Sequence, residues 1–421
     1  MTAETRPFGD GVAPARRHGR SAPHSSVVTS GSPSRSNLRP SRKVFVGMSG
    51  GVDSSVAALL LVEQGYDVTG VYMKNWSQDL PGMKCPWAED LADAKRVAVK
   101  LGIPFEVWDF EKEYKAKVVD YMLDEFKKGN TPNPDIMCNQ EIKFKLFYEK
   151  AMERGADYIA TGHYARAGLK RAKDENKDQT YFLYRISDEA LSRTLFPIGE
   201  MEKPEVKELA KKKGLHNAYK KESMGVCFVG EVGMKDFLKS YVDIQPGEIR
   251  RVEDDKVLGM HEGAIFYTIG QRHGLYLNGE KGEVNDGLPY YVVKKDIKNN
   301  IIYVSKNLND ENLWVDELVL KDTVIRAADE SLLGAFRSPA GRELAREPRG
   351  DGRERRGPKQ GSSAEARNMT VLVRLRHRAP LIPAKFDGKN LIFEEKIKRP
   401  ASGQSAVLYD GEICIGGGII A

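Results

Sequence analysis

The sequence predicts an α/β protein in which a doubly wound parallel sheet is followed by a small central domain and a C-terminal β-barrel. From Lys43 to about Lys235, short apolar runs alternate with helical patterns, which is typical of a parallel sheet with helices on both faces. Beyond Lys235 the pattern changes to short strands and turns, which favours a barrel. The 421 residues, 40% of them hydrophobic, suffice for two or three domains with real cores.

The parallel-sheet part is predicted from its periodicity. Strands are expected at 44–46, 68–73, 105–110 and 158–161. Helices are expected at 56–64, 88–101, 112–127 and 142–154. Gly65 follows the first helix, at a position where a left-handed backbone is common. In such a sheet, ligands bind at the carboxyl ends of the strands.

The second half of the chain is predicted from short strands and turns. A small helix from Phe237, a turn at 245–247 and the segment 264–272 suggest a compact central domain. Barrel strands are expected at 291–294, 301–305, 370–375, 391–393, 405–409 and 413–419. The predicted divisions are a tail at 1–42, a first domain at 43–235, a central domain at 236–289 and a barrel at 290–421, with a disordered insert at about 328–367.

The net charge of +6 is unevenly distributed. Residues 1–43 carry +6 and residues 337–367 carry +4, so the remaining body carries −4. Any contact of the folded part with nucleic acid must therefore come from local patches. No apolar run approaches the roughly 20 residues of a membrane-spanning helix, so no membrane partner is expected.

The tail at 1–42 is rich in Ser, Arg, Pro and Gly, and no acidic residue occurs between Gly11 and Lys43. This composition suits an organellar transit peptide, although a clear amphipathic helix is missing. An untargeted tail is the alternative. We therefore expect a cytoplasmic protein, or a mitochondrial-matrix protein if the tail is a transit peptide.

The four cysteines are widely spaced and form no Cys-x-x-Cys pair; they are Cys85, Cys138, Cys227 and Cys414. This spacing disfavours a zinc ribbon, an iron–sulfur motif and a disulfide scaffold, so a reducing compartment is expected. Cys414 alternates with apolar residues and is expected in the core. Cys85 is expected in a mobile loop, without a catalytic role.

The segment Ser49-Gly50-Gly51-Val52-Asp53-Ser54-Ser55 has the features of an anion-binding loop. It joins a buried strand to a helix start, where backbone N–H groups and the helix dipole favour an anion. Three serine hydroxyls can donate to the same oxygens. The lysine of a Walker loop and the spacing of a dinucleotide fingerprint are both missing. A pyrophosphate cradle is the favoured interpretation, and a ligand-free glycine turn is the alternative.

The loop at 129–139 contains two prolines, which stiffen it, and it presents Asp135 and Cys138 three residues apart. A carboxylate beside a thiol can take its proton or orient the group that it attacks. Lys143 and Lys145 follow, and a nearby ammonium lowers a thiol pKa and attracts phosphate. An inert buried cysteine is the alternative.

Three further segments carry candidate residues. Met73, after the second strand, can border an adenine ring, although a core methionine is the alternative. Gly162 allows close approach of a nucleotide, and His163 and Tyr164 can meet a base or phosphate, unless the histidine is structural. Cys227 follows Cys138 by 89 residues, and two thiols that meet near an activating loop suggest persulfide and disulfide chemistry.

The loop motif Ser-Gly-Gly-x-Asp-Ser resembles the PP-loop of the ATP pyrophosphatases, which have a Rossmann-like sheet and adenylate a substrate. The full set of motifs is similar, in order, to that of the tRNA-specific 2-thiouridylase (tRNA-uridine 2-sulfurtransferase) family. The matching segments are Ser49–Ser55, Met73–Trp76, Thr131–Asn139, Ala160–Tyr164, Lys177–Gln179, Met224–Phe228 and Gly403–Val407. The resemblance implies ATP-dependent conversion of uridine 34, at the wobble position of tRNA, to 2-thiouridine, with release of AMP and pyrophosphate.

The resemblance also implies roles for individual residues. ATP-binding positions are Gly47, Met48, Ser49, Gly50, Gly51, Val52, Asp53, Ser54, Met73 and Gly162. Cys138 matches the nucleophile and Cys227 the persulfide carrier, and Asp135 is our candidate acid/base. Positions matching the target-base segment or tRNA contacts are Asn133, Pro134, Asp135, His163, Lys177, Asp178, Gln179, Arg376, His377 and Gln404.

The implied mechanism adenylates the C2 oxygen of uracil, a poor leaving group, and then delivers sulfur to C2. The sulfur comes from a Cys227 persulfide, directly or as hydrosulfide released by Cys138, and a Cys138–Cys227 disulfide closes the cycle. The target base must flip out of the anticodon loop. Mg²⁺ is expected with ATP, without a visible metal-ligand motif. Expected partners are tRNAs of the Lys, Glu and Gln type and a persulfide sulfur-donor protein, with the central domain binding tRNA and the enzyme monomeric.

The chain departs from the family pattern at two places. It has Glu222-Ser223-Met224-Gly225 where many members have Asp-Ser-Thr-Gly, and its insert at 328–367 matches nothing in the family. Two alternatives remain open. One is another PP-loop adenylating ligase, which would not require two thiols. The other is a non-catalytic tRNA-binding protein that kept the fold.

Overall fold

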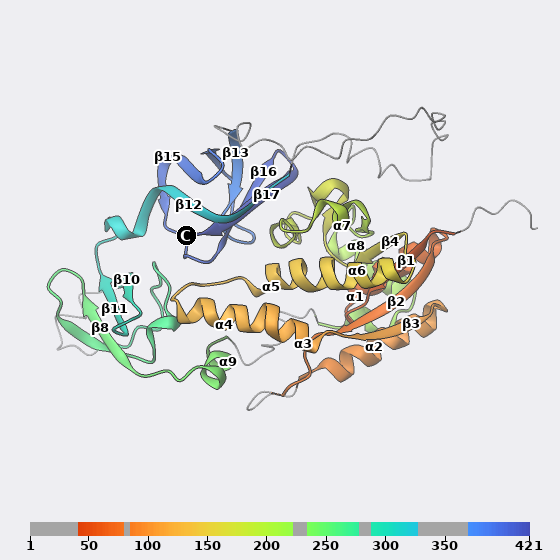
Figure 1. Cartoon of the computed structure of the whole chain (residues 1–421), viewed down its shortest axis with the longest axis horizontal. Helices are drawn as coiled ribbons and strands as arrows, with labels where there is room; N and C mark the ends of the chain where they lie inside the picture. The colour runs from red at the N-terminus through yellow and green to blue at the C-terminus, as the bar shows by residue number, and fades with distance from the viewer. Residues whose placement is uncertain (1–40, 80–84, 222–233, 278–287, 327–368) are drawn as a thin grey trace, which may run out of the picture. The chain divides into compact units, whose positions relative to one another are not determined.

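Figure 1 shows the computed structural model, which describes residues 41–79, 85–221, 234–277, 288–326 and 369–421. The predictions for the tail, for Cys227 and its neighbours at 222–225, and for the insert at 328–367 lie outside these residues. In the described ranges, no helix combines the length and the apolar character needed to cross a membrane.

The first part of the chain forms a five-stranded parallel sheet in the order β3-β2-β1-β4-β7. Its strands are β1 (Lys43–Gly47), β2 (Asp67–Lys74), β3 (Phe105–Asp109), β4 (Tyr158–Thr161) and β7 (Thr194–Leu195). The chain runs outward from β1 to β3 and then returns to β4 on the other side of β1. The strand order therefore reverses between β1 and β4, which is where such sheets bind ligands.

Helices cover both faces of this sheet, as predicted. The main ones are α1 (Val52–Glu63), α2 (Trp87–Leu101), α6 (Phe147–Glu153) and α8 (Lys203–Lys212), and α7 (Asp188–Ser192) is a shorter one. Phe45 of β1 joins one apolar cluster with Phe147, while its neighbour Val46 joins the other with Val56. Alternate residues of β1 are thus buried on opposite faces, which makes the strand apolar throughout.

Two predicted helices differ from the structure at their starts or interiors. The helix expected at 112–127 consists of α3 (Glu111–Tyr114), a π-helical segment at Lys115–Val119 and α4 (Asp120–Lys127). The helix expected from 142 begins at Pro134, with α5 (Pro134–Met137) and a π-helical segment at Cys138–Leu146 that leads into α6. Asn133 caps α5 and Pro134 occupies its first turn, so the expected stiff loop is in part a helix start.

The central part contains α9 (Met234–Tyr241) and a four-stranded sheet in the order β10-β11-β8-β9. The strands are β8 (Gly247–Arg251), β9 (Val257–His261), β10 (Tyr291–Asp296) and β11 (Ile301–Ser305). We expected 291–294 and 301–305 in the barrel, and this was wrong, because β11 pairs with β8. Short strands of either sheet have the same local pattern, so only the long-range pairing of Ile302 with Ile249 decides their partner.

The C-terminal part is a closed six-stranded barrel, as predicted, because β12 pairs with both β15 and β17. Its strands are β12 (Trp314–Ile325), β13 (Met369–Arg374), β14 (Ile382–Phe386), β15 (Asn390–Lys398), β16 (Ser405–Asp410) and β17 (Ile413–Ile420). The sequence reading missed β12 and β14. The sheet continues from β17 into a hairpin of the first domain, β5 (Ala165–Arg166) and β6 (Lys170–Arg171).

The two cysteines for which no catalytic role was predicted, Cys85 and Cys414, are both buried. Cys414 is fully buried on β17, as expected, and burial raises the pKa of its thiol to about 12. Cys85 was expected in a mobile loop, and this was wrong. Its backbone N–H donates to Asp79 Oδ1 at 2.8 Å, and its side chain belongs to the apolar cluster around Trp76.

Candidate active site

The phosphate loop, residues 48–51, joins β1 to α1 at the point where the strand order reverses. Gly50 has φ +78°, and a Cβ there would lie 2.3 Å from the carbonyl oxygen of Asp90, so only glycine fits. Gly51 is the N-cap of α1 and supplies no side-chain cap. The first turn of α1 therefore has no side-chain cap, an arrangement that can bind an anion.

Glycines at two strand ends allow close packing beside the phosphate loop. A Cβ at Gly162, just after β4, would lie 2.5 Å from the backbone nitrogen of Ser54. A Cβ at Gly47 would lie 2.9 Å from Cε of Met73. The structure thus brings Gly47, Met73 and Gly162 to the phosphate loop, as the sequence reading expected. The side chains of Met48 and Val52 are buried, and the Met48 N–H donates to the Val71 carbonyl at 2.8 Å.

The serines of the loop also hold its shape. The Ser49 backbone N–H donates to Ser54 Oγ at 3.2 Å, and Ser55 Oγ donates to the Gly51 carbonyl at 2.9 Å. These bonds fix the loop relative to the first turn of α1. Part of the hydroxyl capacity that the sequence reading assigned to phosphate is therefore used within the protein.

Asp53 forms a partly buried ion pair that sequence reasoning missed. Lys203 Nζ lies 2.6 and 2.8 Å from the two carboxylate oxygens of Asp53, and Tyr164 Oη donates to the same carboxylate at 3.0 Å. Lys203 is 6% exposed and begins α8. The Glu202 capping box and Pro204 predict a helix start there, but no local signal places that start 150 residues away beside the phosphate loop.

Asn217 is a second supporting residue that sequence reasoning missed. Its Nδ2 donates to the Gly50 carbonyl and to Ser55 Oγ, both at 2.9 Å, from a 3₁₀ turn at His216–Tyr219. Lys220 donates to Asp90, whose backbone touches Gly50. The segment 216–220 therefore supports the phosphate loop from outside the sheet.

Asp135 and Cys138 lie one turn apart at the start of the helix that leads to α6. Asn133 Oδ1 accepts the N–H groups of Asp135 at 3.1 Å and Ile136 at 3.3 Å. Burial raises the pKa of Asp135, and the charge of Lys143 offsets part of this rise. Cys138 is 3% exposed and marks the change from α-helix to π-helix, a feature frequent at functional sites. The segment can hold a proton beside a thiol.

His163 connects the phosphate loop to this helix. It follows Gly162, its Nδ1 is 2.8 Å from Thr161 Oγ1, and its ring centroid is 5.7 Å from that of Phe144. Burial, and then the charge of Lys143, lower the pKa of His163 well below its ordinary value, so the ring is neutral at pH 7. Because Lys143 acts on both Asp135 and His163, the strand end and the helix meet around it.

The other predicted tRNA contacts lie where residues 164–182 meet the barrel. Asp178 is 2% exposed and accepts from Arg374 Nη1 at 2.8 Å and from Thr180 Oγ1 at 2.9 Å. Gln179 Oε1 accepts the Tyr164 N–H. Asp178 therefore links this segment to β13 of the barrel through Arg374, and Gln179 links it to the residues that follow β4 through Tyr164.

His377 lies among positive charges and aromatic rings. Its ring centroid is 4.6 Å from that of Phe182, and burial followed by the charge of Arg378 lowers its pKa to about 4. Lys177 and Arg374 also act on it, and Arg376 and Arg378 are exposed. The folded body has a net negative charge, so contact with RNA requires local groups of basic residues such as this one.

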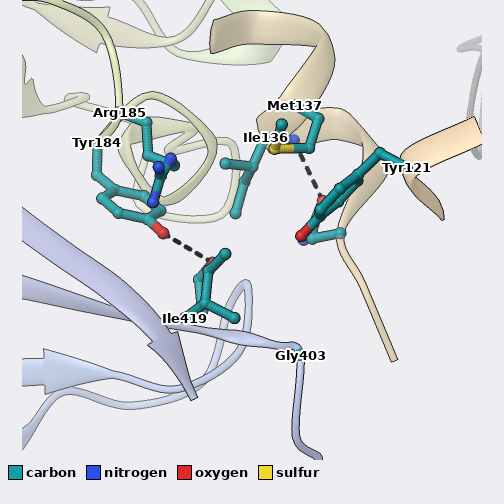
Figure 2. Close-up of a pocket in the computed structure, with 9 residues that line it drawn as sticks. Tyr121, Ile136, Met137, Tyr184, Arg185, Gly403 and Ile419 are labelled. Atoms are coloured by element: carbon teal, nitrogen blue, oxygen red, sulfur yellow. Dashed lines mark hydrogen bonds between the residues drawn. The ribbon is translucent and has the colours of Figure 1, made fainter. Parts of the chain in front are cut away.

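A small cavity separates the Asp135–Cys138 segment from the barrel (Figure 2). Ile136 and Met137 line one side of it, and Gly403 and Ile419 of the barrel line the other. Beside it, the Tyr184 hydroxyl is 3.1 Å from Ser405 Oγ. The candidate catalytic helix start therefore faces the barrel directly.

Cys227 lies outside the described residues, so its predicted meeting with Cys138 stays a prediction. Cys85, Cys138 and Cys414 form no disulfide with one another. Across the described ranges, no cluster of three or more His, Cys, Asp or Glu residues is arranged to hold a metal ion.

Comparisons with known proteins cover all three parts of the chain. Family models match at residues 42–231 (tRNA methyl transferase HUP domain), 235–306 (tRNA methyl transferase PRC-barrel domain) and 359–420 (aminomethyltransferase beta-barrel domain). The chain is 45% identical over 386 residues to the tRNA-specific 2-thiouridylase MnmA of Listeria monocytogenes serovar 1/2a, covering 90% of this chain and 94% of that protein. It is 43% identical over 389 residues to the protein of that name from Staphylococcus saprophyticus, covering 90% and 95%.

Among solved structures, the chain is similar to a 4-thiouridine synthetase in a complex with RNA and bound ATP. The sequences are 22% identical, the TM-score is 0.31, and 43% of each chain is covered.

Proposed function

The chain belongs to the tRNA-specific 2-thiouridylase family, and we propose that it converts uridine 34 of tRNA to 2-thiouridine through Asp135, Cys138 and Cys227. The relatives that span 90% of the chain are named for tRNA 2-thiolation, so this protein is a tRNA sulfurtransferase. The individual residue roles are the proposal.

One observation carries the assignment of the site. Gly162 packs on the start of α1, the next residue His163 packs on Phe144, and Phe144 belongs to the helix that begins with Asp135 and Cys138. An unbroken set of contacts thus joins the phosphate loop to the thiol. A nucleotide held by its phosphates at α1 would therefore have its reactive end on the side of Cys138.

The phosphate loop fits ATP as a substrate. The N–H groups at the start of α1 suit the pyrophosphate end, and the missing side chains of Gly47, Gly50 and Gly162 let Met73, Asp90 and Ser54 pack closely against these glycines. Asp53, in the first turn of α1, offers a carboxylate to Mg²⁺ bound with ATP, and Lys203 balances its charge. Met73 would border the adenine.

Asp135 and Cys138 supply the chemistry after adenylation. Burial raises the pKa of Asp135 above its ordinary value, which suits a carboxyl group that exchanges a proton with the flipped base. The terminal sulfur of a Cys227 persulfide attacks C2 of the adenylated base and AMP leaves with the former C2 oxygen. Attack of the Cys138 thiolate on the inner sulfur of Cys227 then releases the thiolated base and forms a Cys138–Cys227 disulfide. External thiol must reduce that disulfide before the next turnover.

The test uses the purified full chain with ATP, Mg²⁺, a persulfide donor and unmodified tRNA transcript. Mass spectrometry of the digested tRNA should show 2-thiouridine, and Cys138→Ser and Cys227→Ser should each abolish it. Cys414→Ser serves as a control, because Cys414 is buried in the barrel. Unchanged thiolation by Cys227→Ser would remove the persulfide role.

Another PP-loop adenylating ligase is the second candidate, because the phosphate loop alone would serve it equally well. AMP formation that requires tRNA and survives loss of both Cys138 and Cys227 would favour that candidate. A tRNA-binding protein without activity would form no AMP at all.

Several finer statements belong to the same proposal. The expected substrates are tRNAs of the Lys, Glu and Gln type, and the expected partner is a persulfide sulfur-donor protein. We expect a monomer in the cytoplasm, or in the mitochondrial matrix if residues 1–42 are a transit peptide. Nucleoside analysis of a deletion strain, with and without this gene, would test these statements together.

A further inference from the structure

We propose that Lys295, on β10 of the central sheet, is a positioning residue for Asp135 and Cys138. It acts through the three residues Gly129–Thr131, here named the clamped turn, which connect α4 to the cap residue of α5. This inference rests on the proposed roles of Asp135 and Cys138.

The barrel holds one end of the clamped turn. The Thr131 N–H donates to the Ser402 carbonyl at 2.7 Å, and Gln404 Nε2 donates to the Thr131 carbonyl, also at 2.7 Å. Between them, Gly403 has φ +88°, and a Cβ there would lie 2.9 Å from the Thr131 nitrogen. Both backbone groups of Thr131 are thus bonded to one tight turn of the barrel.

The central sheet holds the other end. Lys295 Nζ donates a hydrogen bond to the Gly129 carbonyl at 2.7 Å. Gly129 has φ +84°, and a Cβ there would lie 2.4 Å from Cγ1 of Ile297, so the neighbouring part of the central sheet packs directly on this glycine. Burial lowers the pKa of Lys295 to about 8. A partly buried ammonium bound to a backbone carbonyl is an expensive arrangement, which points to a specific role for the contact.

The clamped turn has little freedom to absorb a displacement. Its first residues close the C-terminus of α4, where the Asn130 N–H donates to the Glu125 carbonyl at 3.0 Å. Only Pro132 separates Thr131 from Asn133, whose side chain caps the helix that carries Asp135 and Cys138. Proline fixes its own φ, so a shift of Thr131 is passed on to Asn133. Two separate domains therefore set the position of the catalytic helix start.

The first readout separates positioning from RNA contact. Lys295→Met removes the donor and keeps the apolar stem, and Lys294→Met is the matched control, because Lys294 is exposed and its Nζ lies 5.3 Å from the Tyr303 ring centroid. Lys295→Met should lower kcat for tRNA thiolation by roughly ten- to a hundredfold with KM for tRNA nearly unchanged. Lys294→Met should leave kcat unchanged, and Lys295→Arg should restore most of the loss. A rise in KM at constant kcat would overturn the proposal.

The second readout does not depend on the reaction. The alkylation rate of Cys138 by iodoacetamide, followed by peptide mass spectrometry, reports how firmly the buried helix start is held. Lys295→Met should raise this rate several-fold relative to wild type and Lys294→Met, with Cys414 unreactive in all three as an internal control for folding. Equal Cys138 rates in Lys295→Met and Lys294→Met would overturn the proposal.

The test also covers two other cases, a variant that does not fold and a wild-type protein without thiolation activity. If Lys295→Met does not fold, Ile297→Ala replaces it, because that change loosens the packing on Gly129 from the same strand end and should raise the Cys138 rate in the same way. If the wild-type protein makes no 2-thiouridine, the proposed function fails, while the alkylation rates still decide whether Lys295 holds the helix start.

Discussion

The two halves of the candidate site are held in different ways. The phosphate loop is fixed by contiguous glycines and serines and by neighbouring strands of its own sheet. The Asp135–Cys138 helix start is fixed by the clamped turn, whose barrel contact through Gln404 spans 273 residues of sequence. The phosphate loop therefore depends on contacts within the first domain, whereas the position of the thiol depends on two other domains.

Substitution of a glycine in the phosphate loop should have the largest effect on stability and on ATP binding. Gly50→Ala combines a positive φ with a Cβ 2.3 Å from Asp90 O, so we expect a loss of about 2–4 kcal/mol in unfolding free energy and at least a hundredfold loss of ATP affinity. Gly65→Ala is the control, because Gly65 has a similar φ of +82° with nothing within 4 Å of a Cβ. It should lose only about 1–2 kcal/mol and bind ATP normally by calorimetry. Equal effects of the two changes would contradict the steric argument.

Breaking the ion pair under the loop should have the next largest effect. Asp53→Asn removes the carboxylate paired with Lys203, and because the Asp53 side chain is 30% exposed, water offsets part of the loss, so we expect about 1–2 kcal/mol in chemical denaturation. Lys203→Met should lower ATP affinity about tenfold, since it removes the charge that balances Asp53. Lys212→Met, in the exposed last turn of α8, should change neither quantity by a measurable amount.

The pH dependence of stability should report the burial of Lys295. Its pKa is lowered to about 8 in the folded protein, against about 10.4 when unfolded. Between these values the unfolded chain binds more protons, so wild type should gain stability relative to Lys295→Met as pH rises from 8 to 10, by up to about 1.4 kcal/mol per pH unit. Urea denaturation at pH 7, 8, 9 and 10 measures the difference. A constant difference would show that Lys295 is not buried in solution.

The smallest expected effect comes from removing the N-cap of α5, compared with removing the N-cap of α7. Asn133→Ala removes the cap of α5, and Ser187→Ala removes the cap of α7, where Ser187 Oγ accepts the Ala190 N–H at 3.2 Å. Each should lower unfolding free energy by about 1 kcal/mol. Only Asn133→Ala should also raise the alkylation rate of Cys138. Comparable Cys138 rates in the two variants would show that the cap does not position the thiol.

The parts of the site that could be predicted from sequence are those encoded over short distances. A glycine pair between an apolar strand and a helix start indicates an anion loop, and the alternation of elements indicates the sheet that presents it. Lys203, Asn217 and the clamped turn could not be found in this way, because each depends on a contact across 150 residues or more. The same limit explains why β10 and β11 were assigned to the wrong sheet.

Burial of single residues was also difficult to predict where the neighbouring sequence is loop-like. Cys85 stands between Lys84 and Pro86, yet it is 7% exposed, because Trp76 and other residues close over it. The α-to-π change at Cys138 likewise has no known local signature. The segment around Pro132 and Pro134 was predicted as a stiff loop, whereas Asn133 and Pro134 form a capped helix start.

The hairpin β5–β6 has a consequence for how the protein is made. It pairs with β17, and the buried hydroxyls of Thr180, Tyr181 and Tyr184 bond to β16 residues Ser405 and Tyr409. During synthesis these polar groups leave the ribosome more than 200 residues before their partners do. These buried hydroxyls of the first domain therefore gain their partners only after the barrel strands have been synthesised.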